Sequence, residues 1–221
     1  MLKDIVYKRI KESIIYGKFP MGSKLSEISL EQILEAKKAP IRDALKRLQA
    51  EGLVERKAKS GTYVFSMETK SLNDLLDFRF AIESRALFLS FEKSPEQLFL
   101  ELAGILDRMQ IAIDNENIKD YLSLDSVFHS TMVSLCENKY YIDSFNLISA
   151  IMDTVRNFLG SNESHLQRSM SQHSKMVAAL KVKNINETIE ILQSHILPQY
   201  GSYWMLSNLE KNKLTCCQTK S

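Results

Sequence analysis

The sequence predicts a mainly α-helical protein, in which three short helices and a β-hairpin precede an all-α bundle of six helices. Three observations support this fold class. The 221 residues include only 7 Gly and 4 Pro, and a shortage of helix breakers favours long helices over a strand-and-turn fold. Apolar residues recur at spacings of three and four along most of the chain. Two short β-favouring runs lie together near residue 60, as is typical of a hairpin.

The composition narrows the class of protein further. Hydrophobic residues make up 44% and charged residues 25%, which is ordinary for a globular chain of one or two domains. The sequence contains no run of 18 apolar residues, so no membrane-spanning helix is predicted. The charged N-terminus also lacks the apolar stretch of a signal peptide. Three Cys residues, two of them adjacent, do not form a disulfide framework. We therefore expect a cytoplasmic protein without a membrane partner.

Charge is distributed unevenly along the chain. Residues 1–66 carry 14 Lys and Arg against 8 Asp and Glu, whereas the remainder carries 15 against 19. A basic first third joined to a mildly acidic remainder is typical of a nucleic-acid-binding module attached to another domain. The alternative is that the asymmetry is accidental, and the motifs decide between the two.

The first two elements are predicted to be helices. Residues 3–16 place four isoleucines on one helical face, and Gly17 ends the helix. Those isoleucines are Ile5, Ile10, Ile14 and Ile15. A loop follows, and then a short helix in SEISLEQILEA, capped by Ser26 or Ser29.

The third helix and the hairpin complete a winged helix-turn-helix. The third helix begins near Pro40, buries Ile41, Leu45 and Leu48, and ends at Gly52. The runs LVERK and GTYVF then form a hairpin around AKSG. One helix of this fold enters the DNA major groove, where base edges are distinguishable, while the hairpin contacts the backbone or minor groove. The candidate DNA-contacting residues are Lys37, Lys38, Arg42, Lys46, Lys59 and Gly61.

Residues 3–66 resemble the GntR family of bacterial transcription regulators. The resemblance lies in Lys37-Lys38-Ala39-Pro40-Ile41-Arg42-Asp43-Ala44-Leu45, followed by Arg47-Leu48, Glu51-Gly52-Leu53-Val54 and Gly61-Thr62-Tyr63-Val64. The departures lie where the family touches DNA: Glu35 replaces the usual Gly of the turn, Lys37 and Ala39 replace Ser and Thr, and Lys38 replaces Arg. The resemblance implies DNA binding, with an operator sequence that differs from those of relatives.

The remainder of the chain is predicted to be a helical domain at 71–207. It follows a linker at 67–70 and precedes a flexible polar tail at 208–221. Six helices are expected, each with an apolar stripe. Their ranges are 71–91, 95–115, 117–136, 139–159, 163–182 and 185–207.

Polar residues interrupt three of these stripes. Asp125 and His129 are four residues apart on one helix, while His173 and His195 lie on the core stripes of two later helices. A charged Asp is almost never buried without a partner, and a divalent metal would satisfy all four side chains. Three imidazoles and one carboxylate suit Zn²⁺, Ni²⁺, Mn²⁺ or Fe²⁺. The alternative is a set of ordinary hydrogen-bonded core residues. The fourth histidine, His165, is expected on the surface.

The same residues resemble the FCD ligand-binding domain of the FadR-like branch of GntR regulators. That domain often has an Asp-x-x-x-His pair followed by single His residues on two later helices, which bind a metal. Arg79, with Glu83 four residues later, matches a further feature of the family, and its planar guanidinium suits a carboxylate. Arg156 is a weaker candidate. The resemblance implies a small organic acid as effector, bound by Arg79 beside the metal, whereas Arg156 is a candidate only through its place on an apolar stripe.

These observations predict a bacterial transcription regulator and not an enzyme. Its partners are expected to be a near-palindromic DNA operator, a small organic acid and a second copy of the chain, because one winged helix contacts too few base pairs. Two alternatives stay open. One is a metal-ion sensor without an organic effector, and the other is a metalloenzyme, for which Glu83 is the nearest candidate base.

Overall fold

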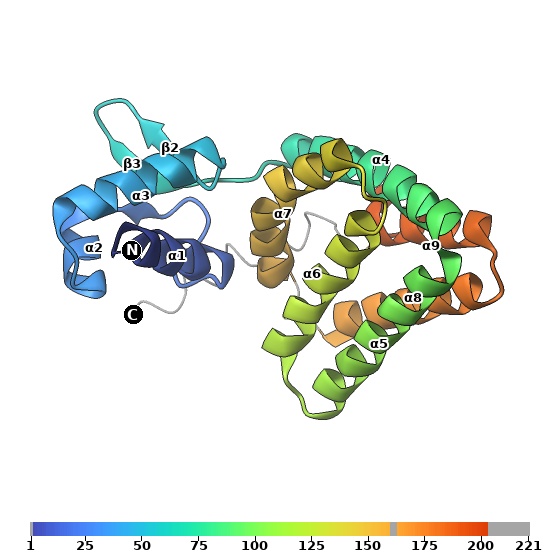
Figure 1. The fold of residues 1–221 in the computed structure, drawn as a ribbon. Helices are drawn as coiled ribbons and strands as arrows, with labels where there is room; N and C mark the ends of the chain where they lie inside the picture. The colour runs from blue at the N-terminus through green and yellow to red at the C-terminus, as the bar shows by residue number, and fades with distance from the viewer. Residues whose placement is uncertain (1, 160–162, 203–221) are drawn as a thin grey trace. The chain divides into compact units, whose positions relative to one another are not determined.

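The computed structural model describes residues 2–159 and 163–202 (Figure 1). The chain divides into two compact units. The first holds the chain up to Glu68 together with Leu147–Phe158, and the second holds Thr69–Asn146 and the chain from Leu159 onward. The expected fold class is confirmed: a small unit with three helices and a three-stranded sheet, and a larger helical unit.

The N-terminal unit begins with three helices and three short strands. In chain order they are α1 (Leu2–Ile15), β1 (Lys24–Leu25), α2 (Glu27–Leu34), α3 (Lys38–Ala50), β2 (Val54–Lys57) and β3 (Gly61–Val64). The sheet is antiparallel in the order β1-β3-β2, and Val54 lies opposite Val64. The hairpin is therefore the wing. Strand β1 lies in a stretch that the sequence predicted as loop, because two residues are too few to show an alternating pattern.

The core of this unit comes from all three helices and the sheet. Its fully buried members include Ile10, Ile14, Leu30, Ile41, Leu48 and Leu53. One expectation was wrong: Ile5 is 55% exposed, and Val6 takes its place in the core. The buried stripe of α1 runs Val6, Ile10, Ile14 at a spacing of four, which leaves Ile5 at its edge.

Glu35, at the end of α2, stands where relatives were expected to carry glycine. Its φ of 53° places it in the left-handed region, as the residue after the helix commonly is. A non-glycine residue costs about 1–2 kcal/mol in this conformation. The helix therefore ends as the family's turn does, but with a strained residue at the turn.

Replacing Glu35 with glycine is expected to raise the free energy of unfolding by about 0.5–1 kcal/mol, because relief of the left-handed strain exceeds the extra entropy of the unfolded chain. Urea unfolding of the full chain measures the change. The matched control is Gln32→Gly in α2, where glycine is expected to destabilise by a similar amount. Two changes of the same sign would contradict this account of the turn.

The second unit is built from long helices. They are α4 (Thr69–Lys93), α5 (Pro95–Asp114), α6 (Ile118–Ser134), α7 (Lys139–Leu159), α8 (Glu163–Lys181) and α9 (Ile185–Ile196), followed by the 3₁₀ turn η1 (Pro198–Tyr200). Helix α7 runs from this unit into the segment grouped with the first. Helix α4 begins inside the expected linker at 67–70. The last helix is shorter than the predicted 185–207, because Pro198 cannot continue it. The predicted tail at 208–221 lies outside the described residues.

Helix caps and neighbouring helices hold in place the helices whose apolar stripes are interrupted by polar residues. The Asn117 side chain accepts a hydrogen bond from the backbone N–H of Asp120 at the start of α6, and Asn184 does the same for Glu187 at the start of α9. Helix α6 packs against α4 and α5, helix α8 against α5 and α9, and α4 against α9. Four of these helices, α4, α6, α8 and α9, therefore meet around the middle of the unit.

Across the described parts of the chain, no helix is both long enough and apolar enough to cross a membrane.

Candidate metal centre and nucleic-acid interface

The helical unit encloses four polar side chains from three helices. Asp125 and His129 come from α6, His173 from α8 and His195 from α9, and all four are at most 1% exposed. One ligand atom from each lies within 4.8 Å of the others. The structure thus brings together all four residues that the apolar stripes singled out. Their assignment as metal ligands stays a prediction.

The Nε2 atoms of the three histidines converge. His129 Nε2 is 3.2 Å from His195 Nε2 and 3.4 Å from His173 Nε2. The Asp125 carboxylate lies beside them, with Oδ1 3.6 Å from His173 Nε2 and Oδ2 4.0 Å from His129 Nε2. In addition, the Ser169 hydroxyl donates a hydrogen bond to Asp125 Oδ1 at 3.3 Å. Three imidazole nitrogens and a carboxylate therefore face one small volume.

Hydrogen bonds at the outer nitrogens determine which inner nitrogens carry lone pairs. His129 Nδ1 lies 2.7 Å from the Glu83 carboxylate and His195 Nδ1 lies 3.0 Å from the Gln172 carbonyl oxygen. Both partners are acceptors, so each Nδ1 carries the proton. In the neutral imidazoles, the two Nε2 atoms that are 3.2 Å apart then present lone pairs to each other. Two lone pairs at this distance repel unless a metal ion or a shared proton lies between the two nitrogens.

A divalent metal fits this donor set. Neutral imidazole nitrogens and a carboxylate oxygen are ligands for Zn²⁺ and the neighbouring transition ions, and outer carboxylates or amides commonly hold the second nitrogen of each ligating histidine. A nearby positive charge would also lower the cost of burying an ionised carboxylate such as Asp125. The geometry of the buried groups is therefore compatible with one ion, and it is less compatible with an ordinary hydrogen-bonded core.

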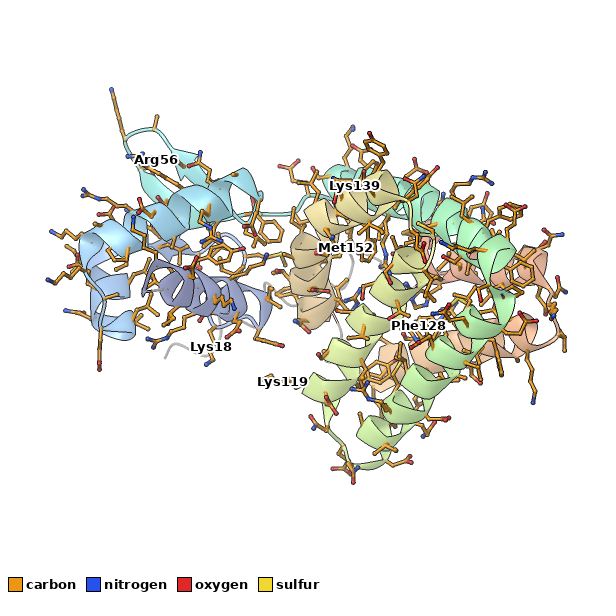
Figure 2. The ribbon with its side chains drawn as sticks, in the orientation of Figure 1. Lys18, Arg56, Lys119, Phe128, Lys139 and Met152 are labelled. Atoms are coloured by element: carbon orange, nitrogen blue, oxygen red, sulfur yellow. The ribbon has the colours of Figure 1, made fainter. Side chains whose placement is uncertain are left out.

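An aromatic ring closes one side of the cluster. Phe128 is fully buried, its ring centroid is 4.5 Å from that of His173, and it meets the His129 ring edge-on at 5.8 Å. Figure 2 shows Phe128 among the helices of the second unit. An apolar ring at this position restricts water and fixes the orientation of two imidazoles.

Arg79 and Glu83 extend the cluster toward α4. Arg79 is 1% exposed, and its Nε lies 2.5 Å from Glu83 Oε1. Through Glu83, the guanidinium is connected to His129. Arg156 is also buried, and its Nη1 forms an ion pair with Asp153 on its own helix at 2.7 Å. The effector roles of Arg79 and Arg156 stay predictions.

Sequence reasoning missed Ser169 and Gln172, named Glu83 only as the residue four positions after Arg79 and as a candidate base, and placed His165 differently. Ser169, Gln172 and Glu83 hold Asp125, His195 and His129. Ser169 lies one helical turn before His173, and Gln172 lies one residue before it. Their closeness to His173 on the same helix was the available signal. His165 was expected on the surface but is half-buried, with Nδ1 3.3 Å from the carbonyl oxygen of Leu159.

Helix α3, the candidate recognition helix for the DNA major groove, presents its basic side chains to solvent. Lys37 caps the helix, Lys38 begins it, and Arg42 and Lys46 follow on the exposed side. Arg42 Nε donates to both oxygens of Glu27 in α2, at 3.1 and 2.9 Å. A groove of about 430 Å³ runs beside this pair, lined by Glu27, Arg42, Leu45, Lys46, Gln49, Arg56 and Thr62.

One acidic residue of α3 lies among these basic groups. The Lys3 ammonium donates a hydrogen bond to Asp43 at 2.6 Å and lowers the pKa of that carboxyl below its usual value. Asp43 therefore stays ionised at neutral pH and is paired within the protein.

The wing carries a second set of cations. Lys59 at its tip adopts a left-handed φ of 58° directly before Ser60 and Gly61. The Nζ atoms of Lys24 and Lys57 lie 5.9 and 5.0 Å from the ring centroid of Tyr63. Arg56, which lines the groove, is drawn on the wing in Figure 2. Arg56 and Lys57 of the wing and Lys24 of β1 were not among the candidates from the sequence; strand alternation in VERK places Arg56 on the same face as Val54.

A winged helix with an exposed basic recognition helix, joined to a helical domain with a buried polar site, defines the class of transcription regulators that combine DNA binding with effector binding. Residues 2–64 match the family model described as "Bacterial regulatory proteins, gntR family", and residues 74–197 match that of the FCD domain. The chain belongs to the gntR family of regulators with an FCD domain. This confirms the resemblance seen in the sequence, and the family consists of transcription regulators.

Curated relatives agree with this assignment, and a solved structure shares the fold. The chain is 24% identical over 180 residues to the gluconate operon transcriptional repressor of Bacillus licheniformis, covering 79% of this chain and 74% of the relative. It is 22% identical over 191 residues to the transcriptional repressor RspR of Escherichia coli, covering 86% and 84%. The crystal structure of a putative GntR regulator from Rhodococcus sp. RHA1 has the same fold, with a TM-score of 0.75, 17% identity and 99% coverage of both chains.

Proposed function

We propose that this regulator binds a near-palindromic operator as a homodimer, and that a small organic acid bound beside a divalent metal in the FCD domain controls its affinity for DNA. The observation that carries the proposal is that four buried ligand atoms converge within 4.8 Å of one another. Two of these atoms are imidazole nitrogens whose lone pairs face each other. Since its partner is DNA, we place the protein in the cytoplasm.

Asp125, His129, His173 and His195 are the residues that would hold the ion, and Zn²⁺, Ni²⁺, Mn²⁺ and Fe²⁺ all suit them. The metal would supply a fixed positive charge for the carboxylate of the effector. Ser169, Gln172 and Glu83 orient three of the four ligands through hydrogen bonds. Phe128 keeps the neighbouring volume apolar, which strengthens electrostatic contacts within it.

Arg79 is the proposed partner of the acid. Its guanidinium is a planar donor with a permanent charge, and it is connected to the cluster through Glu83. The acid changes DNA affinity only if it binds one arrangement of the dimer more tightly than another, because equal affinities for both arrangements shift nothing.

The proposal is tested by DNA binding with metal and acid added separately. Duplexes selected from a random pool by the metal-free chain supply the probe, and fluorescence anisotropy measures affinity with Zn²⁺ or Mn²⁺ alone and with each ion plus a panel of simple mono-, di- and tricarboxylic acids. A shift of about tenfold or more that requires both metal and acid supports the proposal. A full shift with metal alone would contradict it and favour the metal-ion sensor.

Replacing Arg79 with alanine is expected to preserve metal content. It should weaken binding of the carboxylic acid that shifts DNA affinity by about 10-fold or more, because a hydrogen bond to a charged group contributes about 1.5–3 kcal/mol. Isothermal titration of the metal-loaded protein measures the change. The control is Arg85→Ala on the same helix, where the guanidinium stacks 5.0 Å from the Phe88 ring. Unchanged acid affinity in Arg79→Ala would refute the role of Arg79 and leave the metal site intact.

A further inference from the structure

Glu83 touches both halves of the proposed effector site. It lies in α4, its side chain is fully buried, and its two oxygens have different partners. Oε1 is 2.5 Å from Arg79 Nε on the same helix, and Oε2 is 2.7 Å from His129 Nδ1 on α6. One carboxylate therefore joins the proposed acid-binding guanidinium to a proposed metal ligand.

Only a carboxylate satisfies both contacts. Arg79 Nε is always a donor, and His129 must keep its proton on Nδ1 if Nε2 is to face the other imidazoles. Glutamate offers two acceptor oxygens, whereas glutamine offers one acceptor and one donor. A glutamine at this position keeps the volume but must lose one of the two partners.

We propose that Glu83 is a positioning residue that fixes the tautomer of His129 and transmits the state of Arg79 to the metal. This inference rests on the proposed function. When an acid draws the guanidinium away, Glu83 loses its contact with Arg79 Nε and keeps its contact with His129 Nδ1, which strengthens the hold on the ligand and raises metal affinity. By reciprocity, bound metal raises the affinity for the acid by the same factor.

Four forms of the full chain test the proposal, with Co²⁺ alone as the probe: wild type, Glu83→Gln, Arg79→Met, and both changes together. Glu83→Gln is expected to weaken Co²⁺ binding by about 10- to 100-fold, the usual effect of losing a residue that orients a metal ligand. Arg79→Met is expected to bind Co²⁺ at least as tightly as wild type. The double variant is expected to recover most of the loss, because its glutamine oxygen is free to accept from His129.

A second measurement separates positioning from simple charge compensation, which would also restore affinity in the double variant. In the Zn²⁺-loaded protein, the hydrogen-bonded Nδ1–H proton of His129 should give a downfield NMR signal. We expect this signal in wild type and in the double variant, and its loss or displacement in Glu83→Gln. Recovered affinity without the recovered signal would overturn the proposal.

Ser90→Ala is the matched control for stability. Ser90 is buried on the same helix, and its hydroxyl donates a hydrogen bond to the Met132 carbonyl of α6 at 2.9 Å. Its loss should destabilise the α4–α6 contact without changing Co²⁺ affinity. If Glu83→Gln does not fold, Arg79→Met and the double variant still test the proposal, since the double variant must show the His129 signal.

The outcomes distinguish this inference from the proposed function. A wild-type chain that binds neither Co²⁺ nor Zn²⁺ would overturn both. A wild-type chain that binds Co²⁺, together with a folded Glu83→Gln variant of equal affinity and unchanged absorption spectrum, would overturn the role of Glu83 alone.

Discussion

Replacing His173 and His195 together with alanine is expected to reduce the metal content from about one divalent ion per chain to nearly none. Both imidazoles are fully buried, and their Nε2 atoms lie 3.4 and 3.2 Å from that of His129. Two remaining ligands from a single helix do not enclose an ion. Elemental analysis after dialysis against metal-free buffer measures the content.

The same variant should lose the response to added metal and acid while it retains basal DNA binding. A ligand present at 100 times its Kd stabilises the native state by about 2.7 kcal/mol, so added Zn²⁺ should raise the melting temperature of wild type and leave the variant unchanged. His165→Ala is the control, because His165 contacts the Leu159 carbonyl and does not belong to the cluster. Full metal content in the double variant would refute the site.

The sequence determined the inward faces of the helices but not their neighbours. Asp125 and His129 were predicted to share a face because helical periodicity alone places residues four apart together. Periodicity does not say that α4, α6, α8 and α9 meet, so the contact between Glu83 and His129, which are 46 residues apart, was beyond its reach. The same limit explains Ile5, since either Ile5 or Val6 could begin the apolar stripe of α1.

Turns and helix ends were also only partly predictable from the sequence. Gly52 was predicted to end α3 and does lie beyond its last residue, with a left-handed φ of 74°. Glu35 stands at the turn where relatives were expected to carry glycine, and its φ is 53°. The left-handed backbone conformation of the turn is therefore kept although glycine is not. Packing of the adjoining helices offsets the strain of about 1–2 kcal/mol.

Replacing Lys38 and Arg42 together with alanine is expected to weaken operator binding by about 30-fold or more. Lys38 begins the exposed helix α3, and Arg42 lies on the same face of that helix. The Nε of Arg42 donates a hydrogen bond to Glu27. An arginine that reads a base contributes about 1–3 kcal/mol, and a homodimer loses that contribution twice. Each lost Lys–phosphate contact should also lower the slope of log affinity against log salt by about one, or about two per dimer.

Anisotropy titrations at several salt concentrations measure both the affinity and the slope. The matched control is Lys175→Ala with Lys181→Ala, which removes the same charge from exposed positions on α8. If the loss in the first variant came only from net charge, the control would show it as well. Because direct contacts at the start of α3 are local, we expect the control to bind within about twofold of wild type. A folded Lys38→Ala, Arg42→Ala variant that binds the operator like wild type would show that this helix does not read the DNA.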